Sequence, residues 1–276
     1  MKLVTFESNR TLCLGALVPG GVADLSAVAP SMKALIEAGP GGLAAAKAAL
    51  VMPSIRSDAQ LRVPLRPGKV LCCGINYRGH AEENPSAKMP VEPFFFSKLP
   101  SSIIGPDDPI RVPPMSKQVD YEVEFSIVIG RRLSRASEAE VIPAIFGYTL
   151  LNDVSARDVQ FKDGQITLGK NFDGFAPIGP CIVTTDELRD PGNVRLITRL
   201  NGEVMQDGST AEWLFTIPRL LSFLSQVMTL EPGDVVTTGT PAGVGFFKRP
   251  QVFMKAGDTI ELEAPGIGIL RNQVVA

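Results

Sequence analysis

The clearest alternation of hydrophobic and polar positions begins at Asp120, in the run Asp-Tyr-Glu-Val-Glu-Phe-Ser-Ile-Val-Ile. Apolar side chains occupy every second position from Val123 to Ile129, whereas Glu122 and Glu124 take positions between them. Because successive side chains of a strand point to opposite faces, this pattern predicts a β-strand. We expect one face of the strand to lie in the core and the other to be acidic.

The first part of the chain, residues 1–65, has a pattern of its own. Short strands are predicted near 3–6 and 11–17, followed by a helical stretch rich in Ala and Leu that the glycine- and proline-containing run at 39–42 interrupts. Proline and glycine at 64–68 then indicate a linker. We therefore expect a small N-terminal α/β domain that ends near residue 65.

The remainder, residues 66–276, contains short β-rich segments between Gly, Pro and Asn-Gly turn signals. Helices are predicted only near 137–146 and 217–228. Asn201-Gly202 lies between two strand-like runs and is the strongest hairpin signal in the chain. The expected fold class is α+β, with a mainly β body.

Composition is that of an ordinary globular protein of enzyme size. The 276 residues are 45% hydrophobic and 20% charged, which is enough for a full core. The formal net charge is -2, and no cluster of Lys and Arg interleaves with aromatic residues. Nucleic acid is therefore not an expected partner.

No apolar run approaches the length of a membrane span, and residues 1–10 lack the features of a secretion signal. We therefore expect a soluble cytoplasmic protein with no membrane partner. The four cysteines have no Cys-x-x-Cys spacing, which argues against zinc and against a disulfide framework. We interpret them as small buried hydrophobic residues.

Three carboxylates are candidate metal ligands. Glu122 and Glu124 lie side by side on the predicted strand, where buried carboxylates repel each other unless a proton or a cation lies between them. Asp153 follows the apolar strand 148–151 and could complete a set of oxygen ligands. Such a set favours Mg²⁺ first and Mn²⁺ or Ca²⁺ next. Two alternatives stay open: a solvated edge strand for the glutamates, and a helix N-cap for Asp153.

His80 is the one histidine of the chain, and Glu83 follows three residues later. If this loop forms a helical turn, the two side chains face the same way and can share a proton. A histidine held by a carboxylate is a good general base near neutral pH. The alternative is a histidine in a surface loop.

Other candidates contribute polar groups from three segments. Lys98 ends an aromatic run and Lys170 lies in Gly-Lys-Asn-Phe-Asp; either could neutralise an oxyanion or a substrate carboxylate, although a surface lysine is the commoner case. The run 238–245, Thr-Gly-Thr-Pro-Ala-Gly-Val-Gly, is a glycine-rich turn whose backbone amides and Thr240 hydroxyl could hold a carboxylate. It matches neither a Walker loop nor a dinucleotide fingerprint, and a plain tight turn is the default alternative.

Taken in order, these motifs resemble the fumarylacetoacetate hydrolase family, and most closely its short domain-containing members. The resemblance runs from about Lys69 to Val275. The motifs are Gly-Ile-Asn-Tyr followed by His80 and Glu83, Phe-Phe-Phe-Ser ending at Lys98, Asp-Tyr-Glu-Val-Glu at 120–124, Asn-Asp-Val-Ser-Ala-Arg-Asp-Val-Gln at 152–160, Gly-Lys-Asn-Phe-Asp-Gly-Phe at 169–175, and the 238–245 turn.

The resemblance implies a mixed β-roll catalytic domain, usually in a homodimer. It further implies a Mg²⁺ or Mn²⁺ ion, with Ca²⁺ an option in crystals, held by Glu122, Glu124 and Asp153. His80 and Glu83 would form a water-activating dyad on a lid at 78–91. The remaining site residues carried over by the resemblance are Lys170 as a catalytic residue and Lys98, Arg157, Gln160, Thr240 and Tyr77 as substrate contacts.

The activity that the resemblance implies is metal-dependent hydrolysis of a carbon-carbon bond in a 2,4-dioxo acid, such as an acylpyruvate or a fumarylpyruvate. Decarboxylation or keto-enol tautomerisation of oxaloacetate, with a small 2-oxo acid at the same metal site, is the alternative. A non-catalytic binding protein of this fold is the alternative from another class. It requires loss of a ligand or of the dyad, and the sequence has lost neither.

Overall fold

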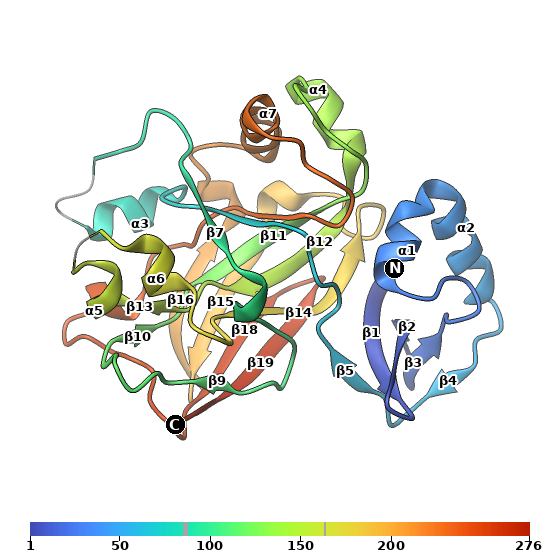
Figure 1. Cartoon of the computed structure of the whole chain (residues 1–276), viewed down its shortest axis with the longest axis horizontal. Helices are drawn as coiled ribbons and strands as arrows, with labels where there is room; N and C mark the ends of the chain where they lie inside the picture. Colours follow the sequence, from blue (N-terminus) through green and yellow to red (C-terminus); the bar gives the residue numbers. More distant parts are fainter. Residues whose placement is uncertain (85–87, 163) are drawn as a thin grey trace.

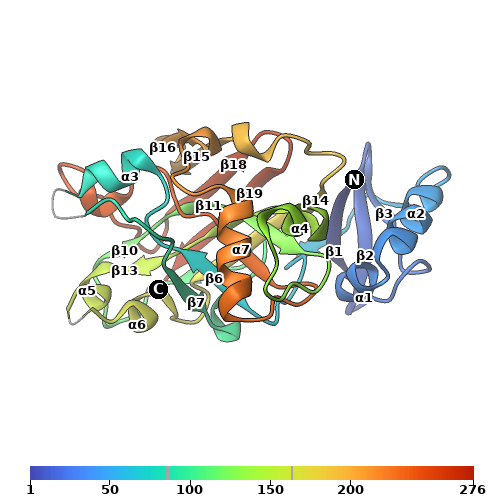
Figure 2. The ribbon, with the colours of Figure 1, turned by 90° about the horizontal axis from the view of Figure 1, so that it is seen from above.

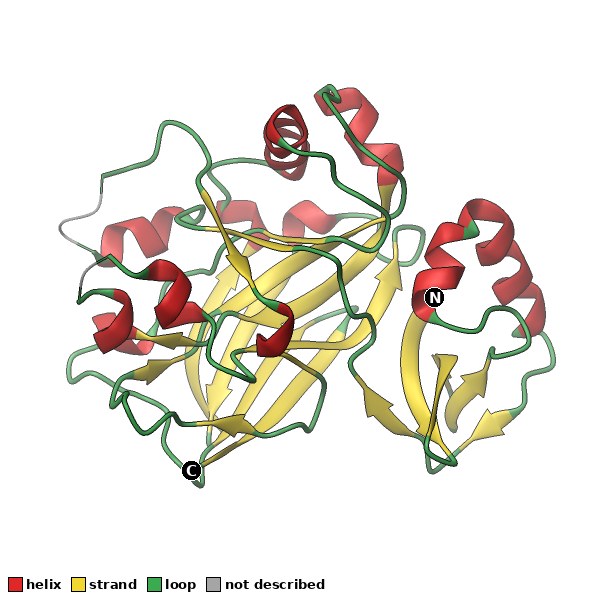
Figure 3. Cartoon of the chain, viewed as in Figure 1, coloured by secondary structure: helices red, strands yellow, loops and turns green. Residues whose placement is uncertain are grey.

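The computed structural model describes residues 1–84, 88–162 and 164–276. The chain is mainly β, as Figure 3 shows, and this confirms the expected fold class. In the described residues the largest sheet has 12 strands. Its main path, in spatial order, is β4 (Ile55–Arg56), β3 (Gly21–Asp24), β2 (Thr11–Val18), β1 (Lys2–Ser8), β14 (Ala176–Thr184), β12 (Ile145–Asn152), β11 (Val123–Ile129), β17 (Val235–Thr237), β6 (Val70–Cys73) and β7 (Phe95–Lys98).

Two short strands extend this path, and two smaller sheets complete the body. Strand β5 (Gln60–Arg62) pairs with β1, and β8 (Ile103–Ile104) pairs with β14. The five-stranded sheet has the order β16 (Glu203–Ser209), β15 (Arg195–Leu200), β18 (Thr259–Ala264), β19 (Gly268–Val275), β9 (Ile110–Arg111), and the two-stranded sheet pairs β10 (Val119–Asp120) with β13 (Ser155–Ala156).

Short helices lie around these sheets. The α-helices are α1 (Met32–Glu37), α2 (Gly39–Ala49), α3 (Arg78–Glu83), α4 (Glu138–Val141), α5 (Arg157–Gln160), α6 (Ile166–Lys170) and α7 (Ile217–Val227), and the 3₁₀ turns are η1 (Pro100–Ser102), η2 (Ile142–Ala144), η3 (Pro191–Asn193), η4 (Thr210–Glu212) and η5 (Gly245–Phe247). Figures 1 and 2 show α1 and α2 beside the N-terminal strands, α7 next to α4, and α3, α5 and α6 gathered at the opposite end.

The strand predicted from the alternating pattern is β11, and it lies inside the large sheet. It pairs with β12 through Phe125↔Leu150 and with β17 through Ser126↔Thr237. Every residue of β11 is buried, because the packed core covers both of its faces. The solvated edge strand is therefore the wrong alternative.

Two predicted helices have different outcomes. The helix near 217–228 is confirmed as α7, whose 11 residues bury one apolar face. The helix near 137–146 ends early, because Pro143 lies in the 3₁₀ turn η2 and the chain enters strand β12 at Ile145. Ile145 and Phe146 belong to the residue types that favour strands, and β12 pairs on both sides.

The hairpin predicted at Asn201-Gly202 is confirmed, since β15 and β16 pair up to Leu200↔Glu203 across that turn. Both turn residues have positive φ, as the tight turn requires. The helical stretch is interrupted where the sequence predicted it, since α1 ends at Glu37, α2 begins at Gly39, and Gly39 has a positive φ. The run 39–42 then forms the first turn of α2, where the proline leaves no hydrogen bond of the helix unmade because its position has no intrahelical acceptor.

The N-terminal strands extend the large sheet. Strand β1 pairs antiparallel with β14 through Leu3↔Ile182, and β2 and β3 continue from β1. The division into two domains at residue 65 stays a prediction. In the described part of the chain all four cysteines are free, and three of them are buried. We find no described helix that is both long and apolar enough to cross a membrane.

Candidate active site

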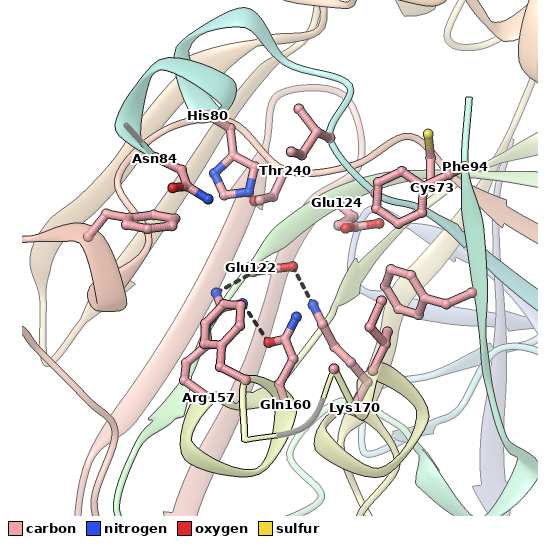
Figure 4. A pocket seen from close by; sticks show the side chains of 17 residues that line it. Cys73, His80, Asn84, Phe94, Glu122, Glu124, Arg157, Gln160, Lys170 and Thr240 are labelled. Carbon is pink, nitrogen blue, oxygen red and sulfur yellow. Dashed lines mark hydrogen bonds and ion pairs between the residues drawn. The ribbon is translucent and has the colours of Figure 1, made fainter. Parts of the chain in front are cut away.

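A cavity of about 290 Å³ opens beside the ends of β11 and β12. Figure 4 shows the residues that line it: His80 and Thr240 lie on one side of Glu122, and Arg157, Gln160 and Lys170 lie on the other. The cavity is formed by segments far apart in the chain, since α3, α5, α6 and the loop after β17 all reach it.

Three carboxylates lie together at this point. Glu122, Glu124 and Asp153 each offer an oxygen, and these oxygens lie within 4.8 Å of one another. The antiparallel register explains the meeting, because Val123 pairs with Asn152 and the Asp153 amide then donates to the Glu122 carbonyl oxygen at 2.9 Å. Asp153 is not a helix N-cap, since α5 starts after Ala156.

Two buried cations hold Glu122. Lys170 Nζ bridges Glu122 Oε2 at 2.8 Å and Asp153 Oδ2 at 2.6 Å, and Arg157 donates to Glu122 Oε1 at 2.6 Å. Burial alone would raise the pKa of Glu122, but Lys170 and Arg157 outweigh burial and hold the pKa well below its usual range. Burial likewise acts to lower the pKa of Lys170, and Asp153 and Glu122 raise it above its usual value.

Two carboxylate oxygens at the centre are buried without a hydrogen-bond partner, namely Glu124 Oε2 and Asp153 Oδ1. Burial, followed by the charges of Asp153 and Glu122, raises the pKa of Glu124 far above its usual value. Such a group is costly to ionise unless positive charge lies next to it. The donor set, all oxygen and all buried, therefore fits a hard divalent cation.

The charge balance of this centre supports the same fit. Four carboxylates are buried in it, those of Asp120, Glu122, Glu124 and Asp153, together with three cations, Lys98, Arg157 and Lys170. Among the described residues at this centre, negative charge thus exceeds positive charge when every carboxylate is ionised. Either a proton on Glu124 or an added cation corrects the imbalance.

Lys98 lies behind the carboxylates and not among the residues that line the cavity. Its Nζ donates to the backbone carbonyl oxygens of Val154, Lys170 and Phe175. It also forms a fully buried ion pair with Asp153, at 2.6 Å from Oδ1. The structure thus places Lys98 as a support for Asp153.

His80 and Glu83 lie together on α3, as the one-turn prediction required. His80 Nδ1 and Glu83 Oε2 are 3.0 Å apart, and the second oxygen, Oε1, accepts a hydrogen bond from the Gly243 amide. Because an ionised carboxylate only accepts, Nδ1 carries the shared hydrogen and Nε2 remains as the basic nitrogen. The His80 ring also lies 6.1 Å from that of Phe247. Residues 85–87 of the expected lid fall outside the described residues.

The amides of the glycine-rich turn bind carboxylates of the protein itself. Gly243 holds Glu83, and the amides of Gly245 and Phe246 donate to Asp120 at 2.8 and 3.0 Å. Asp120 in turn accepts from Arg157 Nε at 2.9 Å. Two amides of the run that the sequence indicated as a substrate carboxylate site, those of Gly243 and Gly245, are therefore already used.

The remaining predicted substrate contacts are placed differently. Gln160 and Thr240 line the cavity, and Gln160 Oε1 accepts from Arg157 at 3.1 Å. Tyr77 is fully buried, does not line the cavity in the described structure, and has a hydroxyl without a partner. Six apolar side chains contribute to the cavity lining: Ile75, Phe94, Phe96, Phe161, Ile166 and Phe247.

Comparison with known proteins agrees with this geometry. The family model "Fumarylacetoacetate (FAA) hydrolase C-terminal" matches residues 69–275. This match covers well over half of the chain. The chain belongs to the fumarylacetoacetate hydrolase family.

Relatives of known name within the fumarylacetoacetate hydrolase family match the chain end to end. The oxaloacetate tautomerase Fahd2a, mitochondrial, of Rattus norvegicus is 41% identical over 288 residues, covering 100% of this chain and 92% of the relative. A solved fumarylacetoacetate hydrolase from Exiguobacterium antarcticum has a TM-score of 0.91 at 38% identity, covering 100% and 99%. The maleylpyruvate hydrolase from Sphingobium has a TM-score of 0.85 at 30% identity, with the same coverage. Relatives of this chain are therefore enzymes.

Sequence reasoning missed several residues of this family site. Asp120 opens the acidic motif but was not singled out, because nothing in its spacing distinguishes it from a solvated carboxylate. Gln206, which contacts Thr240 from the five-stranded sheet, has no local signal at all. The phenylalanines of the lining read as ordinary core residues.

Proposed function

We propose that this protein catalyses the keto-enol tautomerisation of oxaloacetate or a closely similar 2-oxo diacid. The observation that carries the proposal is the buried trio of Glu122, Glu124 and Asp153, which lies at a cavity that His80 also lines. The chain is also 41% identical over its whole length to a protein named oxaloacetate tautomerase. The site and the relative therefore support the same chemistry.

Glu122, Glu124 and Asp153 would hold a divalent cation such as Mg²⁺ or Mn²⁺, which when bound would withdraw electron density from the C2 carbonyl of the substrate. Lys170 keeps Glu122 and Asp153 in place and adds fixed positive charge where negative charge develops on the C2 oxygen. The guanidinium of Arg157 adds a second fixed charge at the same wall.

The proton movement falls to His80. Its Nε2 would accept a proton from C3 as the C3–H bond breaks, and the electron pair of that bond forms the C2–C3 double bond. The imidazolium then delivers the proton to the C2 oxygen, which completes the enol. Glu83 holds Nδ1 and stabilises the imidazolium during the transfer. No water molecule is consumed, and the reverse sequence regenerates the ketone.

Hydrolysis of a 2,4-dioxo acid is the second candidate. The pairing of His80 with Glu83 at 3.0 Å suits activation of a water molecule equally well. Likeness to the maleylpyruvate hydrolase from Sphingobium favours it too. The two reactions require the same oxygen ligands and differ in whether His80 removes a proton from carbon or from water.

A direct assay tests the proposal. Enol oxaloacetate is added to metal-stripped protein with and without Mg²⁺ or Mn²⁺, and the ultraviolet absorption of the enol is followed. We expect metal to accelerate the loss of the enol. The accelerated rate should fall about 10²- to 10⁴-fold in Glu83→Gln. It should not fall in the matched control Glu82→Gln, because Glu82 is exposed. No acceleration with either metal would refute the tautomerase, and acetate plus pyruvate from acetylpyruvate would establish the hydrolase instead.

We further propose the expected homodimer, which light scattering on the purified protein would test. The cytoplasmic location also stays a prediction, and the rat relative carries the word mitochondrial in its name. Fractionation of cells that express the full chain would distinguish the two compartments.

A further inference from the structure

Gln206 of β16 connects a metal-ligand strand to the cavity wall. Its side chain is almost fully buried, with 1% exposed. Oε1 accepts from the Val123 amide at 3.0 Å and from the Thr198 hydroxyl at 2.8 Å, and Nε2 donates to Thr240 Oγ1 at 2.8 Å and to the Pro241 carbonyl oxygen at 2.9 Å. The amide oxygen of Gln206 thus accepts two hydrogen bonds, and the amide nitrogen donates two.

These partners allow only one orientation of the Gln206 amide. The Val123 backbone N–H can only donate, so the atom that faces it must be the oxygen. The Pro241 carbonyl can only accept, so the atom that faces it must be the nitrogen. A flipped amide would set donor against donor and acceptor against acceptor in a buried site, which is costly.

The orientation of Gln206 determines what Thr240 presents to the cavity. An amide nitrogen cannot accept a hydrogen bond, so Thr240 Oγ1 must accept from it. The hydroxyl hydrogen is then left for another acceptor, and within the described residues Thr240 Oγ1 donates to none. Thr240 is 2% exposed and lines the cavity on the same side as His80 (Figure 4).

We propose that Gln206 is a positioning residue that fixes Thr240 as a hydrogen-bond donor to an oxygen of the substrate. This inference rests on the proposed function, because it takes the substrate to be a 2-oxo acid. A carbonyl, carboxylate or enolate oxygen satisfies such a donor, and a substrate group that only donates does not. A neutral donor held in a buried wall favours charge that develops on oxygen.

Gln206 also fixes where that donor lies. It bonds Val123, the residue between Glu122 and Glu124, and therefore ties the Thr240 loop to the strand that carries two of the three carboxylates. The donor and the carboxylates consequently keep a constant separation. A bidentate 2-oxo acid requires such a fixed frame.

The experiment is a double-mutant cycle on the full chain loaded with Mg²⁺. Thr240→Val removes the donor but keeps the shape, Thr240→Ser keeps the donor, and Gln206→Met removes the amide at similar length. The readouts are kcat/KM for oxaloacetate and the affinity for oxalate, a planar dianion of carboxylate oxygens, by titration calorimetry. We expect Thr240→Val to lower kcat/KM about 100-fold and to lower the affinity for oxalate. Thr240→Ser should keep the wild-type kcat/KM and the wild-type oxalate affinity.

The cycle separates positioning from a general structural role. We expect Gln206→Met to lower kcat/KM in the wild-type background and to have little further effect in the Thr240→Val background, because its action passes through that hydroxyl. Fully additive losses, or an equal loss of Mn²⁺ affinity in Gln206→Met, would show that Gln206 merely supports β11 and would overturn the proposal.

Two further outcomes are decisive. If Gln206→Met does not fold, unchanged oxalate affinity in Thr240→Val would by itself overturn the proposal, and weakened affinity rescued by Thr240→Ser would uphold the donor. If the wild type binds oxalate but does not tautomerise oxaloacetate, the proposed function fails, and the oxalate cycle still tests this inference independently.

Discussion

Lys98 Nζ lies 2.6 Å from Asp153 Oδ1, and both side chains are completely buried. Lys98 combines this ion pair with hydrogen bonds to three backbone carbonyl oxygens. On the other side of the same carboxylate, Lys170 Nζ lies 2.6 Å from Asp153 Oδ2. A candidate metal ligand thus lies between two buried lysines, Lys98 and Lys170.

Lys98→Met should destabilise the fold strongly. The substitution removes the buried positive charge beside Asp153 and the hydrogen bonds that Lys98 donates to three carbonyl oxygens, of which Phe175 keeps a donor in the Val154 amide. We expect a loss of about 3–5 kcal/mol in the free energy of unfolding, which is typical of breaking a buried ion pair from one side. Urea denaturation of the metal-free protein measures it, with the exposed Lys162→Met as a control. A change below about 1 kcal/mol would contradict the support role.

Glu124→Gln should separate metal binding from folding. The amide removes a carboxylate whose pKa is raised by burial and by the charges of Asp153 and Glu122. We expect the metal-free melting temperature to rise, by about 2–4 °C for each kcal/mol of repulsion relieved. Mn²⁺ affinity, by calorimetry, should fall more than about 100-fold, beyond the effect typical of residues that only orient ligands. Unchanged affinity would remove Glu124 from the ligand set, and the exposed Glu138→Gln serves as the control.

Asp120→Asn should impair catalysis while leaving the ligands in place. Asp120 accepts from Arg157 Nε and from the amides of Gly245 and Phe246, so an amide nitrogen at this position would face at least one donor. We expect kcat/KM to fall roughly 10- to 100-fold, chiefly through KM, as Arg157 loses its orientation. Steady-state kinetics of Asp120→Asn, with the exposed Asp173→Asn as a control, test this. Equal kinetics for the two variants would show that Asp120 is dispensable.

The ion pair of Lys47 with Asp186, 2.8 Å long, should give a pH-dependent contribution to stability. Hydrogen bonding to Lys47 lowers the pKa of Asp186 from 3.8 to about 2. The folded state thus favours the ionised form, so the stabilisation is complete above about pH 4 and is lost as pH falls through 2. Both side chains are about half exposed, so we expect less than about 1 kcal/mol.

Thermal melts of wild type and Asp186→Asn between pH 7 and pH 2 provide the measurement. The difference between them should shrink as the solution is acidified, whereas Asp58→Asn, at an exposed position, should show no such trend. A difference that grows toward low pH would give the contribution the wrong sign.

The sequence was sufficient where a local pattern and the tertiary structure agree. Alternation after Glu122 indicated β11, the Asn201-Gly202 signal indicated the hairpin, and the family resemblance, now confirmed, followed from ordered motifs. Ile145 shows the opposite case. A helical start at Ser137 was extrapolated through residues that pairing with β11 and β14 draws into a strand.

The residues of the site could be predicted only where the type of side chain indicates its role. Lys98 reads as a substrate contact from its position after an aromatic run, but three carbonyls that converge from distant segments make it a support. Gln206 has no signal, because its importance arises from the approach of β16 to β11 and to the Thr240 loop. Such contacts depend on the whole topology and cannot be predicted from a short stretch of sequence.

The pairing of β1 with β14 has a consequence for any attempt to prepare the catalytic region alone. Leu3, Leu35 and Ile36 share one hydrophobic cluster with Ile182 and Leu151, the residue two places before Asp153. A fragment that starts at residue 66 would expose that apolar surface together with the unpaired edge of β14, a combination that favours aggregation. The first strands thus cover the apolar surface and the edge of the sheet that carries the candidate ligands. Expression of the whole chain, residues 1–276, is therefore the better route to active protein.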